Sequence, residues 1–132
     1  MCIRDSADIE PNVLIQAFAA SENAALEKGV TIRFCDTRLA TSPALAGIKH
    51  CNRLEQVLAR AEWRDEAIFE GLMFDQSDYL VEGTMSNLFF MRRGEMCTPL
   101  LDRCGVAGVT RCLLYTSPSP RDATLSRMPS SA

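Results

Sequence analysis

Two residues in this sequence stand where an ionisable side chain is unusual, and both could do chemistry. Lys49 follows Gly47 and Ile48, which offer little to solvate an ammonium group. Desolvation lowers the pKa of a lysine and makes its amine nucleophilic, as a Schiff-base lysine requires. Glu82 precedes Gly83 in the apolar run LVEGTMSNLFF, where a buried carboxylate needs a partner. A buried Glu82 could keep the ring nitrogen of a cofactor protonated. Taken alone, each residue also fits an ordinary charge that faces solvent.

The stretch GVAGVTR, Gly105 to Arg111, offers a third kind of group. It supplies two glycines, a threonine hydroxyl and an arginine in a loop that is predicted to open a helix. Exposed amides at a helix N-terminus form an anion site, so a phosphate could bind there. A lone glycine-rich stretch also fits an ordinary turn, so its meaning depends on whether it lies near Lys49 and Glu82.

The segments before the lysine are predicted to form strands. The apolar run NVLIQAFA, residues 12–19, fits a buried strand, although its period alone also allows a helix. The next segment, VTIRFCDTR, alternates apolar and polar residues with a period of two. This pattern predicts a strand that buries Val30, Ile32 and Phe34 on one face.

A helix is predicted directly after the lysine. Apolar residues recur at the spacing i, i+3, i+4, i+7 and are expected to form its buried face: Leu54, Val57, Leu58 and Ala61. Asn52 followed three residues later by Glu55 resembles a capping box, which predicts the start of the helix.

The next part of the chain alternates short β-prone runs with turns. Asp75 to Tyr79 and Arg92 to Glu95 are turn-like, so residues 67–99 are predicted to form a small antiparallel meander. The order strand, strand, helix and several strands predicts an α+β fold.

Both ends of the sequence are predicted to come from read-through of a short DNA fragment. The opening MCIRDS and the tail CLLYTSPSPRDATLSRMPSSA back-translate to sequences that resemble a transposase sequencing adapter. Segments of this kind are excluded from fold predictions. We therefore expect residues 1–6 and 112–132 to be adapter translation, the second of them disordered, and residues 7–111 to carry the fold.

Composition excludes several classes of function. Residues 7–111 hold 11 Lys and Arg against 15 Asp and Glu, a net charge of −4, which argues against a nucleic-acid partner. Their four cysteines are irregularly spaced, which indicates neither a metal site nor a disulfide framework and fits the reduced thiols of a cytoplasmic protein. No stretch approaches the roughly 20 apolar residues of a membrane span, so no membrane partner is expected.

Taken together, the segments that carry the candidate residues and their neighbours resemble one family. CDTRLA, LAGIKHCNRLEQVLARAEW, EGLMFD, LVEGTMSNLFF and RCGVAGVTR are similar in order and spacing to the class IV pyridoxal-phosphate enzymes. That family includes branched-chain aminotransferases, D-amino-acid aminotransferases and aminodeoxychorismate lyase. The resemblance implies part of a D-amino-acid aminotransferase-like fold. Residues 7–46 would be the end of the small N-terminal domain and the linker, and residues 47–111 the start of the cofactor-binding domain.

The resemblance also implies roles for five residues. Lys49 would be the catalytic residue, which carries pyridoxal 5'-phosphate as a Schiff base and moves the substrate proton. Glu82 would pair with the pyridine nitrogen. Val109 and Thr110 would bind the cofactor phosphate through an amide and a hydroxyl. Arg53 lies near the position from which some relatives contact the phenolic oxygen of the cofactor.

Within the family, the segment IKH-x-NRLEQVLARAEW resembles the lyase. That resemblance implies conversion of 4-amino-4-deoxychorismate to 4-aminobenzoate and pyruvate in folate biosynthesis. A branched-chain or D-amino-acid aminotransferase remains the alternative, because it would share all the cofactor residues. The family implies a small-molecule substrate and a homodimer. We expect the chain as it stands to be an inactive, truncated polypeptide, because such enzymes complete the phosphate and substrate sites with regions that it lacks.

Overall fold

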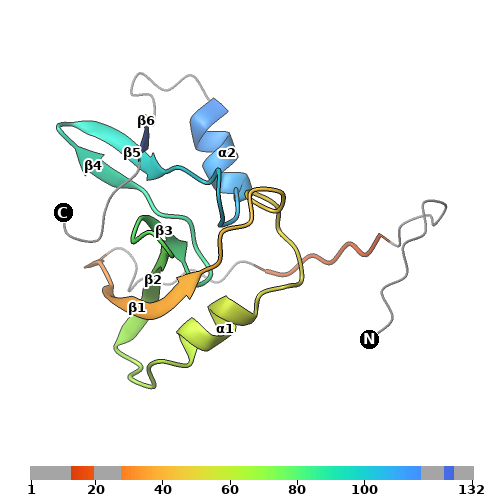
Figure 1. Ribbon diagram of the computed structural model, residues 1–132, viewed down its shortest axis with the longest axis vertical. Coiled ribbons are helices and arrows are strands. Elements are labelled where there is room, and N and C mark those ends of the chain that lie inside the picture. Colours follow the sequence, from red (N-terminus) through yellow and green to blue (C-terminus); the bar gives the residue numbers. More distant parts are fainter. Residues whose placement is uncertain (1–12, 20–27, 117–123, 127–132) are drawn as a thin grey trace.

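The computed structural model of the chain describes residues 13–19, 28–116 and 124–126. The elements within these ranges run in the order β1 (Thr31–Leu39), α1 (Leu54–Arg60), β2 (Ile68–Asp75), β3 (Leu80–Gly83), β4 (Phe90–Arg92), β5 (Glu95–Pro99), α2 (Val109–Thr116) and β6 (Thr124–Ser126). They form an α+β arrangement of two small sheets and two short helices (Figure 1).

The first sheet has the strand order β1-β2-β3. β1 and β2 are parallel, and the connection between them contains α1, which lies along one side of this pair (Figure 1). β2 and β3 form an antiparallel hairpin whose turn follows Asp75. The Asp75 carboxylate accepts hydrogen bonds from the amides of Ser77 and Tyr79, at 2.8 and 3.0 Å, which confirms the predicted turn.

The second sheet has the strand order β4-β5-β6, so the prediction of one continuous antiparallel meander was wrong. β4 and β5 form a hairpin, and its turn places Arg93 and Gly94 at φ 53° and 84°, the left-handed pair that a tight hairpin needs. After β3 the Thr84 amide still donates to the Gly71 carbonyl of β2 at 3.0 Å. The next residues, Met85 and Ser86, bond to the Glu70 side chain as the chain leaves the first sheet.

The C-terminal part is more ordered than predicted. Residues 112–116 continue α2, and Thr124–Ser126 pairs in parallel with β5. The expected disorder is therefore wrong for these two segments, and the rest of the tail lies outside the described residues. The helix continues because the Cys112 amide donates to the Gly108 carbonyl at 3.0 Å, and the first proline comes only at Pro118.

The core lies between the first sheet and α1. It consists of buried side chains from β1, α1, β2, β3 and the loops between elements: Cys35, Leu39, Ala59, Trp63, Met73, Val81 and Cys104. The indole nitrogen of Trp63 donates to the Ile68 carbonyl at 3.2 Å, which ties the end of α1 to the start of β2.

The predicted strand β1 is present, but the face that it buries is the opposite of the predicted one. Cys35 and Leu39 are buried against α1, whereas Ile32 and Phe34 are 48% and 63% exposed. The period of two was therefore correct and the buried face was wrong. The predicted strand at 12–19 also fails in the described part, since residues 13–19 have no regular structure and are exposed.

The helix α1 shows the same kind of difference. It begins at Leu54, yet no side chain caps it, because the Glu55 carboxylate accepts instead from the Ala40 amide at 3.0 Å. Its buried residues are Gln56 and Ala59 rather than the predicted apolar face, whose member Val57 is 61% exposed. Among the described residues, no helix has the length and apolar character that a membrane crossing requires.

The Glu62 carboxylate, just after α1, holds β1 in place. It accepts hydrogen bonds from the amides of Asp36 and Thr37, at 2.9 and 2.8 Å, and from Arg33 at 3.2 Å. Partial burial alone would raise the pKa of Glu62, but the hydrogen bonds from Thr37 and Asp36 and the Arg33 charge outweigh it and lower this pKa. Its ionised form therefore stabilises the fold.

Replacing Glu62 with glutamine should lower the free energy of unfolding by about 1–3 kcal/mol at neutral pH. Because the folded pKa lies below the unfolded one, this stabilisation is present above pH about 4.3 and is lost as the pH falls through the folded pKa. Thermal unfolding of wild type and variant at pH 7 and near pH 3 checks this. Glu66→Gln, at an exposed position, is the control, and an equal gap at both pH values would contradict the assignment.

Candidate functional site

A cavity of about 630 Å³ opens between α1, the segment that follows β3, and the loop before α2. Its lining contains four of the five residues that the sequence singled out: Lys49, Arg53, Glu82 and Val109. Thr110, the fifth, follows Val109 at the start of α2 but is not among the lining residues. The structure thus brings together residues that lie up to 60 positions apart in the sequence.

Lys49 lies on a segment that is tied to the glycine-rich loop. The Gly47 amide donates to the Gly105 carbonyl, and the Ala107 amide donates to the Gly47 carbonyl, both at 3.0 Å. Gly47 has φ 79°, a left-handed conformation that favours glycine. The predicted desolvation of Lys49 is wrong for this structure, because its side chain is exposed at the open side of the cavity.

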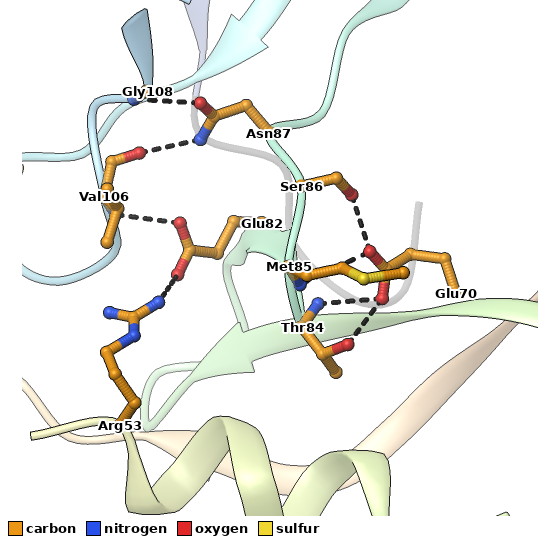
Figure 2. A network of polar contacts seen from close by, with 9 residues as sticks. All are labelled: Arg53, Glu70, Glu82, Thr84, Met85, Ser86, Asn87, Val106 and Gly108. Atoms are coloured by element: carbon orange, nitrogen blue, oxygen red, sulfur yellow. Dashed lines mark hydrogen bonds and ion pairs between the residues drawn. The ribbon is translucent and has the colours of Figure 1, made fainter. Parts of the chain in front are cut away.

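The Glu82 carboxylate is buried in the floor of the cavity, with 2% of the residue exposed. It accepts from the Val106 amide at 2.8 Å and pairs with the Arg53 guanidinium at 3.4 Å (Figure 2). Burial raises the pKa of Glu82, although the Val106 amide, Arg53 and Gln56 act in the opposite direction. Glu82 is thus a buried and paired carboxylate, not an outward-facing residue of an edge strand.

Asn87 holds the glycine-rich loop against the end of β3. Its side-chain amide donates to the Val106 carbonyl at 2.7 Å and accepts from the Gly108 amide at 2.9 Å (Figure 2). A side chain at Gly108 would overlap with the Asn87 amide oxygen and would have to displace the Asn87 side chain from its present position. Glu82 and Asn87 therefore both fix the path of the chain into α2.

Removing the Asn87 amide should release this loop. Asn87→Ala should lower the free energy of unfolding by about 1–3 kcal/mol, because the Gly108 amide and Val106 carbonyl lose their partners. Thermal unfolding and amide hydrogen exchange at residues 106–108 measure the effect. Asn52→Ala is the matched control, since Asn52 makes no cap bond to α1, and an equal loss in both variants would contradict the argument.

The helix α2 begins at Val109, as the stretch GVAGVTR predicted. Val109 and Thr110 are exposed, and Arg111 anchors the first turn by donating to the Pro99 carbonyl at 3.1 Å. The first amides of a helix have no partner within it and form an anion site together with the helix dipole. No acidic residue lies in the first turn of α2 to oppose an anion there.

Glu70 is a second buried carboxylate near the cavity, and its importance was missed in the sequence. Only 4% of the residue is exposed, and its oxygens accept hydrogen bonds from residue 71 and from residues 84–86. Figure 2 shows the contacts with residues 84–86. The signal was present, since Glu70 is an acid within the apolar run IFEGLMF, as Glu82 is in its own run.

The donor set fits a phosphorylated heteroaromatic aldehyde better than a metal ion. The cavity offers one amine, one buried carboxylate and one helix N-terminus, and its volume lies within the roughly 300–1,000 Å³ of ligand pockets. Among the described residues, no three His, Cys, Asp or Glu side chains are grouped so that they could hold a metal ion.

Known proteins match both the sequence and the fold. Residues 3–122 match the family model described as amino-transferase class IV. The chain is 42% identical to the aminodeoxychorismate lyase of Vibrio harveyi over 95 residues, and 34% identical to a probable branched-chain-amino-acid aminotransferase of Thermotoga maritima over 90. These matches cover 72% and 65% of this chain but only 35% and 31% of the relatives.

Solved structures show the same relationship. The crystal structure of 4-amino-4-deoxychorismate lyase from Pseudomonas aeruginosa matches with a TM-score of 0.74 and 46% identity, over 80% of this chain and 40% of that one. A branched-chain amino acid aminotransferase, solved as a complex with N-(5'-phosphopyridoxyl)-L-glutamate, matches at 21% identity with a TM-score of 0.66, which supports the fold alone. The chain therefore has the class IV aminotransferase fold and spans about a third of the length of the curated relatives it matches.

Proposed function

Because this chain belongs to the class IV aminotransferase family, we propose that its cavity binds pyridoxal 5'-phosphate through Lys49. The observation that carries the proposal is the shared cavity, in which the Lys49 amine, the buried Glu82 carboxylate and the start of α2 face one space. In this role Glu82 holds a proton on the pyridine nitrogen, and Val109 and Thr110 bind the phosphate. Arg53, which pairs with Glu82, would contact the phenolic oxygen of the cofactor.

The chain's own groups suit proton transfer. Bound pyridoxal phosphate would supply an electron sink for the carbon that bears the substrate amine. The Lys49 amine, on its flexible stem at the open side of the cavity, can take the proton from that carbon and return it elsewhere. As a buried carboxylate, Glu82 can accept a hydrogen bond from a protonated ring nitrogen, and this contact would favour the protonated form of that nitrogen.

We further propose that the polypeptide to which this segment corresponds is a lyase. It would convert 4-amino-4-deoxychorismate to 4-aminobenzoate and pyruvate, in folate biosynthesis. The lyases from Vibrio harveyi and Pseudomonas aeruginosa support this, at 42% and 46% identity. The Thermotoga maritima relative, at 34% identity, keeps amino-acid transamination as the second candidate. A cytoplasmic homodimer acting on a small molecule is part of the same proposal.

The two candidates differ in whether they need an acceptor. A chimera in which residues 7–111 replace the matching segment of the Vibrio harveyi lyase should form 4-aminobenzoate and pyruvate from 4-amino-4-deoxychorismate without any keto acid. Product formation that requires a keto-acid acceptor would favour the aminotransferase. The 132-residue chain alone should form neither product, since it spans 35% of that relative.

A further inference from the structure

We propose that Glu70 is a positioning residue for the cofactor cavity, acting through the turn that follows β3. This inference rests on the proposed pyridoxal-phosphate site. Glu70 lies on β2, opposite that turn, and does not itself line the cavity. The turn residues Thr84, Met85 and Ser86 do line it, directly after Glu82 and Gly83. Glu70 therefore contacts the turn that forms one wall of the cavity without lining the cavity itself.

The number and direction of the contacts set Glu70 apart from an ordinary buried acid. Its Oε1 accepts from the Thr84 amide at 3.0 Å and the Thr84 hydroxyl at 2.6 Å, as well as from the Gly71 amide at 2.9 Å. Its Oε2 accepts from the Met85 amide at 3.3 Å and the Ser86 hydroxyl at 2.7 Å. One carboxylate thus holds every residue of this wall (Figure 2).

The backbone is built to let the carboxylate reach this position. A Cβ added to Gly83 would lie 2.8 Å from Oε2 of Glu70, closer than real contacts allow. The Gly83 amide also donates to the Ser86 carbonyl at 2.8 Å, which closes the turn. Because Gly83 follows Glu82 directly, the Glu70 contacts set the position of both the wall and the end of the strand that carries the Glu82 carboxylate.

The property that this position uses is the capacity of a carboxylate to accept hydrogen bonds on both of its oxygens. In all five hydrogen bonds Glu70 is the acceptor. A glutamine of the same shape has one accepting oxygen and one donating NH2 group, so it can satisfy only some of these donors. With glutamine, the amide nitrogen at the Oε2 position would face the Met85 amide, donor against donor, while the Ser86 hydroxyl could rotate to accept. Glu70→Gln should therefore keep the strand and loosen the wall at residues 85–86.

The test uses the 132-residue chain, which contains two lysines, Lys28 and Lys49. The chain is incubated with increasing pyridoxal phosphate, reduced with borohydride and analysed for pyridoxyl groups by peptide mass spectrometry. In Glu70→Gln the concentration for half-maximal labelling of Lys49 should rise at least about tenfold, because buried donors lose a charged acceptor. Labelling of Lys28 should not change, and amide exchange at residues 85–86 should become faster.

Two further variants keep the outcome decisive. Glu66→Gln is exposed and should behave as wild type. Ser86→Ala removes one of the five contacts, so it should give a smaller shift than Glu70→Gln does. Equal Lys49 labelling in wild type and Glu70→Gln overturns the proposal. If Glu70→Gln does not fold, Lys49 labelling in Ser86→Ala that equals wild type overturns it instead. No selective labelling of Lys49 in wild type overturns the cofactor site itself, even if the exchange rates still differ.

Discussion

Replacing Lys49 with alanine in the Vibrio harveyi chimera should lower the rate of pyruvate formation by at least about 1,000-fold, within the range of a lost general base. The reason is that Lys49 is the one amine that lines the cavity. The rate is measured with saturating pyridoxal phosphate, so that weaker cofactor binding does not limit it. Thermal unfolding of the variant should change little, because the Lys49 side chain is exposed.

The matched control is Lys28→Ala in the same chimera. Lys28 is the second lysine of the chain and is also exposed, but it does not line the cavity. Its replacement should leave the rate within about twofold of the unmodified chimera, as expected for a surface change. A Lys49→Ala rate close to that of the control would remove Lys49 from the chemistry.

The second large effect should come from Glu82. Glu82→Gln in the chimera should lower the rate of pyruvate formation by at least about 100-fold, comparable with the loss of one preorganised polar contact in a reacting site. Glutamine keeps an acceptor for the Val106 amide, so the loop before α2 should remain in place. Glu55→Gln is a matched acidic control outside this cavity, and a similar loss in that variant would contradict a specific role for Glu82.

Glu82 should also leave a signature in the pH dependence of stability. Burial raises the folded pKa of Glu82 above its unfolded value, so the folded chain binds the proton more tightly. The stabilisation that this bound proton gives to the folded chain is therefore largest below the unfolded pKa of Glu82, and it is lost as the pH rises through the folded pKa. In the 132-residue chain, Glu82→Gln should flatten this part of the unfolding curve. An unchanged slope would mean that Glu82 does not titrate abnormally.

The elements that position the site were predictable because they depend on local patterns. The strand β1, the helix α1, both hairpin turns and the start of α2 follow from alternation, helical spacing and turn residues. The faces that these elements bury were not predictable. Ile32 on β1 and Val57 on α1 have the right period, but the described fold covers the opposite side of each element. Period fixes which residues share a face, and only tertiary packing decides which face is covered.

The site was predictable in its residues and less so in its environment. The buried state of Glu82 could be argued from its apolar neighbours, and Arg53, as its partner, became visible only in three dimensions. Lys49 was expected to be desolvated, yet it lies at the open side of the cavity. Glu70 and Asn87 act through contacts between segments more than ten residues apart in the sequence, so no local pattern indicates what they hold.

The central claim is that this cavity directs pyridoxal phosphate to Lys49. Borohydride reduction of the 132-residue chain after incubation with the cofactor, followed by peptide mass spectrometry, tests it directly because the chain offers only two lysine side chains. At low cofactor concentration the pyridoxyl group should be found on Lys49 in large excess over Lys28. Equal labelling of the two lysines, or none at Lys49, would contradict the account.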